Sequence, residues 1–453
     1  MTVEGSMEES QPNWSVQEVG EMMRSFGVWD YTVFTFMLAS CGSVGIYFGF
    51  IKKSSGVDEY LVGGRNMKTF PVSLSLIASF ISGISLLGTP TEVYVHGTSY
   101  LFIGIGVIIV GFLMSSIYLP IFHELKLTST YEYLERRFDK KIRLLGSVLF
   151  SISIMTWLPI VIYVPALAFN QVTGVNVHVV TPFVCIEVIY ILRLAGAKDQ
   201  LLPLLVMNIL REFPGLPGLF VAGVFSAALS SLSTGLNSMA AVVLEDFIKP
   251  FKKTPFSPKV TDILLKLTVV ILGVICVALV FVVEKTGSHV LQLSTNLASI
   301  TSGPSLGIFS MGILLPWVNA KGALIGGLAG LGFMGWFSLS AEAAIASGRI
   351  KFDEKPVSTE GCYYSFPQVE NLMLLEPPDN ILDNDDFLPE PLTLYRLSYL
   401  WYTLTGALVT MSIGLVVSRI TSEDVEKLDP MLLAPFIRKL LKNKETQQEA
   451  SNV

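Results

Sequence analysis

Long apolar stretches separated by short polar ones recur along this chain of 453 residues. A stretch of about 20 nearly uncharged residues is the length that an α-helix needs to cross a bilayer. The pattern therefore predicts an all-α polytopic membrane protein with about ten transmembrane helices. The apolar runs are 31–51, 70–94, 101–121, 144–168, 177–194, 216–244, 261–283, 289–316, 321–340 and 397–418.

Composition supports a protein of the lipid bilayer. Charged residues make up 15% of the chain, against about 25% in soluble domains, and the mean hydropathy is +0.58. The net charge is −6 and the basic residues form no continuous stripe, which excludes nucleic acid as a partner.

The acidic first thirty residues lack an early apolar core, so we expect no cleaved secretory signal. The four cysteines predict neither a zinc site nor a disulfide framework.

Basic residues predict the orientation of the helices. They cluster after the runs 31–51 and 101–121, and positively charged loops stay in the cytoplasm. The N-terminus is then extracellular, where Asn13 lies in a possible glycosylation sequon, and the basic C-terminal tail is cytoplasmic. We expect a multi-pass protein of the plasma membrane.

Strict alternation fails at one place. The run 216–244 should end outside, yet the very basic segment 245–259 follows it. An odd number of spans missing around 186–198 would explain the fault. The alternatives are a re-entrant run and a single exception to the charge rule.

These features divide the chain into successive segments. The segments are an extracellular N-terminal part (1–30), a first transmembrane block (31–194), a junction loop (195–215), a second transmembrane block (216–340), an extracellular loop (341–395), a last transmembrane helix (396–420) and a cytoplasmic tail (421–453).

Ionisable residues inside a bilayer usually mark function, but the predicted spans hold almost none. Glu187 and Arg193 lie beside the suspected junction, and His178 and His289 lie near span ends. Proton pumping therefore has little support. The sequence shows no soluble catalytic constellation, so we expect neither an enzyme nor a cofactor.

The second run is rich in small and hydroxyl residues. Gly83, Gly88 and Pro90 make an uninterrupted helix unfavourable there. A helix that unwinds in the membrane exposes carbonyl oxygens, which suit a sodium ion if they line a cavity. Close packing through small residues explains the same composition. Ser82, Gly83 and Ser85 are substrate or gating candidates.

Two further runs share this character. Ser230 and Ser231 in the run 216–244 can turn hydroxyls toward a neighbouring helix, where they could hold sodium weakly or simply bond between helices. Gly303 and Pro304 in the run 289–316 predict a third broken helix, a candidate hinge or gate.

At these residues the chain resembles the sodium/solute symporter family, in its multivitamin and monocarboxylate transporter branch. The matching motifs include WDY at 29–31, EYLVGGRNM at 59–67, TSTYEYLERRF at 128–138, DQLLP at 199–203 and PGLPGLF at 214–220. The resemblance resumes through 216–244 and extends to about residue 420.

The resemblance implies an inverted repeat of five plus five helices. It places a sodium site between the runs 70–94 and 216–244. The ligands carried over by motif are carbonyl oxygens of Ala78, Ile81 and Ala227 and the hydroxyls of Ser230 and Ser231.

The resemblance also implies that about three central helices are absent between Ile186 and Lys198. The expected function is sodium-coupled uptake of a small organic anion, either a vitamin such as biotin or pantothenate or a monocarboxylate. A truncated, non-transporting isoform that acts on a full-length relative is the alternative, and a channel is a third option.

Overall fold

The computed structural model describes the chain in several parts. The described residues are 26–47, 68–125, 127, 129–173, 203, 206, 209–210, 213–249, 257–283, 290–350, 352, 392–421 and 429–441. Within these residues all regular structure is helical. The longer helices are α2 (Val28–Ile46), α4 (Thr69–Phe80), α5 (Gly83–His96), α6 (Ile103–Leu113), α7 (Leu119–Leu125), α8 (Thr130–Arg137), α9 (Lys140–Thr173), α12 (Leu216–Val242), α13 (Pro258–Val283), α14 (Val290–Leu314), α15 (Ala320–Ala346) and α16 (Tyr402–Thr421).

Seven described helical stretches are long and apolar enough to cross a membrane. They correspond to seven of the ten predicted runs. Two more runs overlap described helices: 31–51 overlaps α2, and 70–94 overlaps the pair α4 and α5. The run 177–194 lies outside the described residues, as do Asn13, His178, Glu187, Arg193 and His289.

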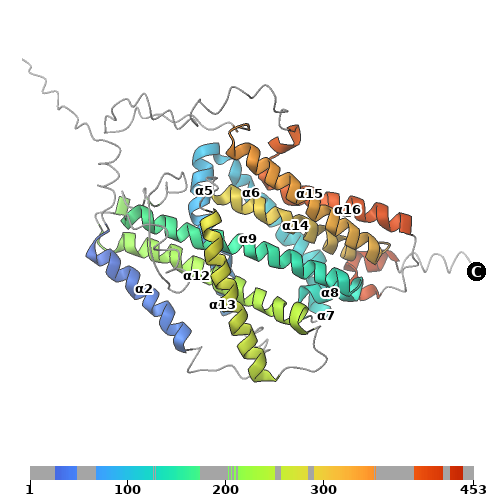
Figure 1. Ribbon diagram of the computed structural model, residues 1–453, viewed down its shortest axis with the longest axis horizontal. Helices are drawn as coiled ribbons and strands as arrows, with labels where there is room; N and C mark the ends of the chain where they lie inside the picture. The colour runs from blue at the N-terminus through green and yellow to red at the C-terminus, as the bar shows by residue number, and fades with distance from the viewer. Residues whose placement is uncertain are drawn as a thin grey trace, which may run out of the picture.

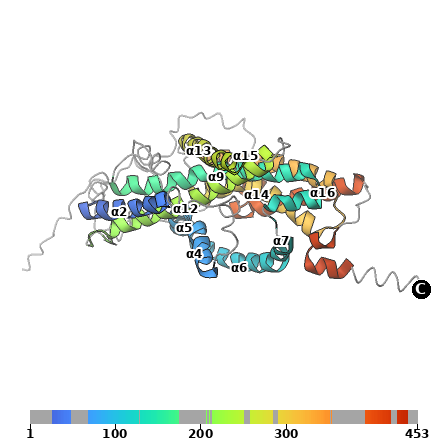
Figure 2. The same cartoon turned by 90° about the horizontal axis from the view of Figure 1, so that it is seen from below.

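The helices form an elongated layer (Figure 1). Seen from below, α2, α9, α12, α14, α15 and α16 lie along this layer, with α13 on one side and α4, α6 and α7 on the other (Figure 2). The 34-residue α9 lies at its centre and packs against α12, α13 and α14. Leu158 and Ile162 of α9 are fully buried among side chains of α12 such as Val221 and Phe225.

A buried carboxylate joins α2 to the start of α12. Asp30 Oδ1 accepts hydrogen bonds from the amides of Gly215 at 3.0 Å and Gly218 at 3.1 Å, and its Oδ2 accepts one from Gly27 at 2.9 Å. Gly215 has a φ of +89°, and a Cβ on Gly218 would lie 2.3 Å from the Asp30 carbonyl oxygen. The glycines thus let the two backbones meet at the carboxylate.

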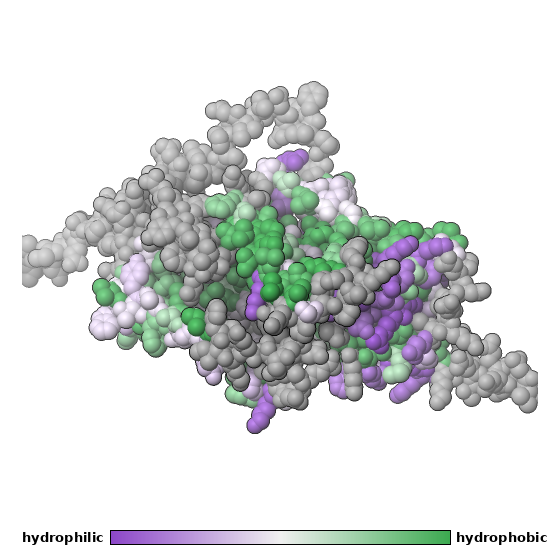
Figure 3. Space-filling view, turned by 60° about the horizontal axis from the view of Figure 1, so that its bottom comes forward, coloured by the Kyte–Doolittle hydropathy of each residue, from purple (hydrophilic) through white to green (hydrophobic). Residues whose placement is uncertain are grey.

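The space-filling view shows a patch of hydrophilic residues toward one end of the molecule (Figure 3). Arg137 of α8 is buried and donates to the carbonyls of Gly312, Leu315 and Val318, around the C-terminal end of α14. A cation there complements the negative end of the helix dipole. Burial lowers the pKa of the Arg137 guanidinium from its ordinary value.

A second arginine connects three segments at this end. Arg143 of α9 bonds to Glu135 of α8 at 2.7 Å and to Asp246 at 2.8 Å. Asp246 lies in the π-helical turn η6 (Val243–Ile248) and also accepts a bond from Ser147. Arg137 and Arg143 belong to the basic segment that follows the run 101–121, and the structure shows that both hold helix ends together.

The helices α14, α15 and α16 pack against one another through glycines. A Cβ on Gly326 of α15 would lie 2.6 Å from the carbonyl oxygen of Thr410, and one on Gly330 would lie 1.9 Å from the Thr410 hydroxyl. A Cβ on Gly303 of α14 would lie 2.9 Å from the Gly406 Cα. Glycine therefore permits backbone contact among α14, α15 and α16.

This packing corrects the prediction of a break at Gly303 and Pro304. The helix α14 continues from Val290 to Leu314 with Pro304 inside it. Close contact with α16 keeps the backbone in place, and Ser302 adds a hydroxyl contact to Thr403 at 3.2 Å. A Gly-Pro pair that would end an isolated helix is tolerated here because neighbouring helices support it.

One segment boundary shifts, and part of the predicted tail is packed. The helix α15 extends to Ala346, so the first residues of the predicted loop 341–395 belong to a helix. In the tail, Leu432 and Ala434 are buried, and the amide of Ala434 donates to the Ile313 carbonyl at 3.0 Å. Part of the tail therefore packs against the end of α14.

Candidate sodium and solute site

The predicted interruption of the second run is present. The helix α4 ends at Phe80, and Ile81 has a ψ of 99°, which is extended rather than helical. The helix α5 begins at Gly83. The interruption lies before Gly83, whereas Gly88 and Pro90 are accommodated inside α5.

A capping box begins α5. The amide of Ser82 donates to Ser85 Oγ at 3.2 Å, and the amide of Ser85 donates to Ser82 Oγ at 3.4 Å. In a continuous helix the Ser82 amide would instead bond to the Ala78 carbonyl. The two serines therefore stabilise the interruption by satisfying amides at the new helix start.

Gly83 brings the interruption close to its neighbours. A Cβ at this residue would lie 3.2 Å from Val164 Cγ1 of α9 and 3.5 Å from Val224 Cγ1 of α12. Gly83 is buried. Its role in the described structure is close approach of α5 to α9 and α12.

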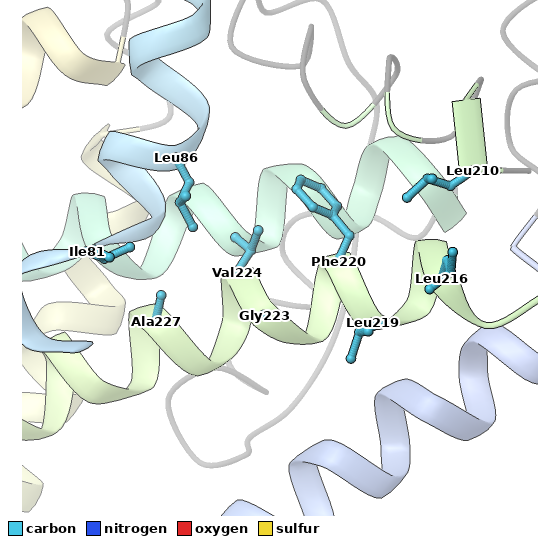
Figure 4. A pocket seen from close by; sticks show the side chains of 9 residues that line it. All are labelled: Ile81, Leu86, Leu210, Leu216, Leu219, Phe220, Gly223, Val224 and Ala227. Atoms are coloured by element: carbon cyan, nitrogen blue, oxygen red, sulfur yellow. The ribbon is translucent and has the colours of Figure 1, made fainter. Parts of the chain in front are cut away.

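A pocket opens where the interruption faces α12 (Figure 4). Its volume is about 400 Å³, and its lining side chains are all apolar. Ile81 and Ala227, two of the predicted sodium ligands, lie near one another at one end of it. The lining residues are Ile81, Leu86, Leu210, Leu216, Leu219, Phe220, Gly223, Val224 and Ala227.

The other predicted ligands, Ala78, Ser230 and Ser231, do not line the pocket. Ser231 is 2% exposed and Ser230 is partly exposed, and both follow Ala227 by about one turn of α12. The Ser230 carbonyl accepts a bond from the Thr234 hydroxyl at 2.9 Å. Ala78 lies in the last turn of α4, and its side chain lies outside the described residues.

The structure thus gathers some candidates and separates others. Ser82, Gly83 and Ser85 lie at the interruption, with Ile81 and Ala227 beside it. Gly303 and Pro304 belong instead to the contact of α14 with α15 and α16, as described above.

A sequence-family comparison gives this arrangement a context. The model described as "Sodium:solute symporter family" matches residues 60–193 and 179–330. The chain belongs to the sodium:solute symporter family. Membership places it among membrane transporters rather than enzymes, and both helices of the candidate site fall within the matched residues.

Relatives define the branch of the family. The chain is 30% identical over 541 aligned positions to sodium-coupled monocarboxylate transporter 1 of Xenopus laevis, covering 87% of this chain and 86% of the relative. It is 27% identical over 553 positions to the human sodium/iodide cotransporter, covering 89% of this chain and 85% of the relative.

A solved structure has the same fold. It is a substrate-bound, outward-open state of a Na⁺-coupled sialic acid symporter, with a TM-score of 0.60 and 17% identity, covering 88% of this chain and 98% of that chain. This likeness establishes the all-α, inverted-repeat symporter fold.

The alignment to the Xenopus relative is longer than the part of this chain that it includes. It has 541 positions, but 87% of this 453-residue chain supplies fewer than 400 of them. More than a hundred positions of the relative therefore have no counterpart here. The two blocks of the family match meet at residues 179–193. This location agrees with the predicted junction at 186–198.

One acid in a candidate membrane span was missed from the sequence. Glu342 was assigned to the extracellular loop because the apolar run ends near residue 340, but it lies inside α15. It accepts a hydrogen bond from Asn296 of α14. The signal available in the sequence was Ser338, which places a second polar group one turn earlier on the same face.

Proposed function

We propose that this chain couples sodium entry to the uptake of a small organic anion, most simply a short monocarboxylate. The supporting observation is the interrupted helix α4–α5 facing α12, with Ile81 and Ala227 lining one pocket. The monocarboxylate and iodide transporters among the relatives favour an anionic solute, and they favour a monocarboxylate over a vitamin.

The two halves of the interrupted helix suit two opposite charges. The C-terminal end of α4 presents carbonyl oxygens and the negative end of its dipole, which attract a cation. The N-terminal end of α5 presents backbone N–H groups and the positive end of its dipole, which attract a carboxylate. We assign the sodium ion to the carbonyls of Ala78, Ile81 and Ala227 and the hydroxyls of Ser230 and Ser231.

The pocket suits the rest of such a solute. Leu86, Phe220 and Val224 provide an apolar wall next to the α5 terminus, so a carboxylate at the terminus can direct its hydrocarbon part along them. The pocket of about 400 Å³ exceeds the needs of a short carboxylic acid. We infer that helices absent from this chain would close it in the longer relatives.

Purified chain in proteoliposomes tests the proposal. An inward sodium gradient should drive accumulation of labelled short monocarboxylates above the level with a potassium gradient. Ser231→Ala should raise the sodium concentration needed for half-maximal uptake, and Ser226→Ala, on the same helix outside the assigned ligands, should leave it unchanged.

Absence of sodium-driven uptake by folded protein would contradict transport by this chain. A change in the uptake rate of a longer relative when this chain is reconstituted with it would instead assign it a modulating role. We further propose the plasma membrane, with an extracellular N-terminus and a cytoplasmic C-terminus, and glycosylation at Asn13 in intact cells tests that orientation.

A further inference from the structure

Polar side chains line the contact between the N-terminal half of α14 and the C-terminal half of α15, and none of them lines the α4–α12 pocket. Glu342 of α15 is partly buried, and its Oε2 accepts a hydrogen bond from Asn296 Nδ2 at 2.5 Å. One turn deeper, the hydroxyls of Ser299 and Ser338 lie 3.1 Å apart. These four residues form the Glu342 cluster.

The cluster is enclosed by protein. Asn296 and Ser338 are each 1% exposed, and Ser299 is fully buried. Both helices are continuous and are among the spans that can cross a membrane. A carboxylate held at such a place is costly unless it has a charged or polar partner.

One polar atom of the cluster lacks a partner. The Asn296 amide oxygen has no hydrogen bond within the described residues, although it is fully buried. An unsatisfied buried acceptor is energetically unfavourable. Turning the amide over gives no relief, because the oxygen would then face the Glu342 carboxylate and the nitrogen would lose its acceptor.

A small cation would resolve this arrangement. It would take the Asn296 amide oxygen and the Glu342 carboxylate as ligands. Both are hard oxygen donors. The single carboxylate matches one positive charge, and the described residues hold no group of three His, Cys, Asp or Glu side chains suited to a metal ion.

We propose that the Glu342 cluster is a second monovalent-cation site, occupied by sodium through Glu342 and Asn296. The ion lies between α14 and α15, where it would neutralise the intramembrane carboxylate. This site uses different helices from the α4–α12 site, so it stands or falls independently of the proposed transport function.

Binding of radioactive sodium to the purified full chain tests the proposal. Measurements in nanodiscs, with choline as the replacement cation, should resolve two saturable components in the unmodified protein. Glu342→Gln should remove one component while keeping a hydrogen-bond acceptor for Asn296. Glu132→Gln is the matched control, because it neutralises an acid of α8, paired with Arg136 at 2.5 Å, that belongs to neither site.

A second variant guards against misfolding. Asn296→Ser removes the amide oxygen but leaves the Glu342 charge, and it should weaken the same component in protein that remains monodisperse and helical. Unchanged sodium binding in both folded variants would overturn the site.

The α4–α12 site is followed in the same assay. Ser231→Ala should remove the component that Glu342→Gln leaves. Loss of all binding in Ser231→Ala, with none lost in Glu342→Gln, would refute the Glu342 site alone. Loss only in Glu342→Gln would refute the sodium ligands assigned under the proposed function.

Discussion

Glycines occur both in the bundle of α14, α15 and α16 and on the exposed helix α6, but they do different things in the two regions. In the bundle, Gly326 and Gly330 meet α16 closely. On α6, a Cβ at Gly104, Gly106 or Gly111 would meet nothing within 4 Å. The most apolar part of Thr98–Leu125 has no buried residue, against 56% buried in α14.

This difference indicates where packing partners are missing from the chain. The three helices of the bundle follow one another beyond the junction, so each finds its neighbours. Apart from the turns that flank it, α6 makes at most marginal contacts with other described helices. We infer that positions of the longer relatives that have no counterpart here supply such partners.

Overfilling the bundle should have the largest effect. Gly326→Leu would push a side chain into the backbone of α16 at Thr410 and Gly414. We expect loss of folded protein, since overpacking of a tight contact is unfavourable by about 1–3 kcal/mol or more. Fluorescence-detected size exclusion after heating measures it. Gly106→Leu on α6 is the control, and equal damage from both substitutions would refute the comparison.

The attachment of α2 should show the next largest effect. Asp30→Ala would leave the amides of Gly215 and Gly218 without their acceptor. We expect about 2–4 kcal/mol of destabilisation, because each orphaned buried amide is unfavourable by about 1–3 kcal/mol. Thermal unfolding of purified protein checks this. Asp30→Asn keeps an acceptor oxygen and should lose less; if the two variants behave alike, these hydrogen bonds do not hold α2.

The capping box at the helix interruption should contribute less. Ser82→Ala removes the acceptor for the Ser85 amide, and loss of an N-cap destabilises by about 1 kcal/mol. Thermal unfolding should show this small decrease. Ser82→Thr retains the hydroxyl and should restore most of the stability, whereas a decrease as large as that of Ala would argue against capping.

The smallest effect, with the opposite sign, is expected on α6. Gly111→Ala should leave stability unchanged or raise it by about 0.5–1 kcal/mol, because alanine favours a helix interior and the space is open. Unfolding of the chain alone measures this. A clear destabilisation would mean that another part of the chain already packs on α6.

The sequence anticipated much of this architecture for identifiable physical reasons. Hydropathy located the spans, and the serine- and glycine-rich segment at 73–90 predicted the interruption. The prediction at Pro304 was wrong because contact with Gly406 is a tertiary effect that local propensity does not contain. Glu342 was missed because the predicted span was ended at residue 340, before the charged side chain of Glu342. The helix α15 continues to Ala346.

The site was predictable only in part. Ile81 and Ala227 could be paired from the family resemblance, and the structure places them on one pocket. The carboxylate of Asp30 was visible only as part of a motif, because its partners Gly215 and Gly218 are far away in sequence.

Sodium protection of a cysteine placed in the pocket tests the central claim most directly. In a background without the four native cysteines, Ala227→Cys keeps the backbone carbonyl and adds a thiol beside the interruption of α4 and α5. A membrane-impermeant thiol reagent should label it in choline and label it more slowly in sodium. Equal labelling rates in the two salts would contradict a sodium site between α4 and α12.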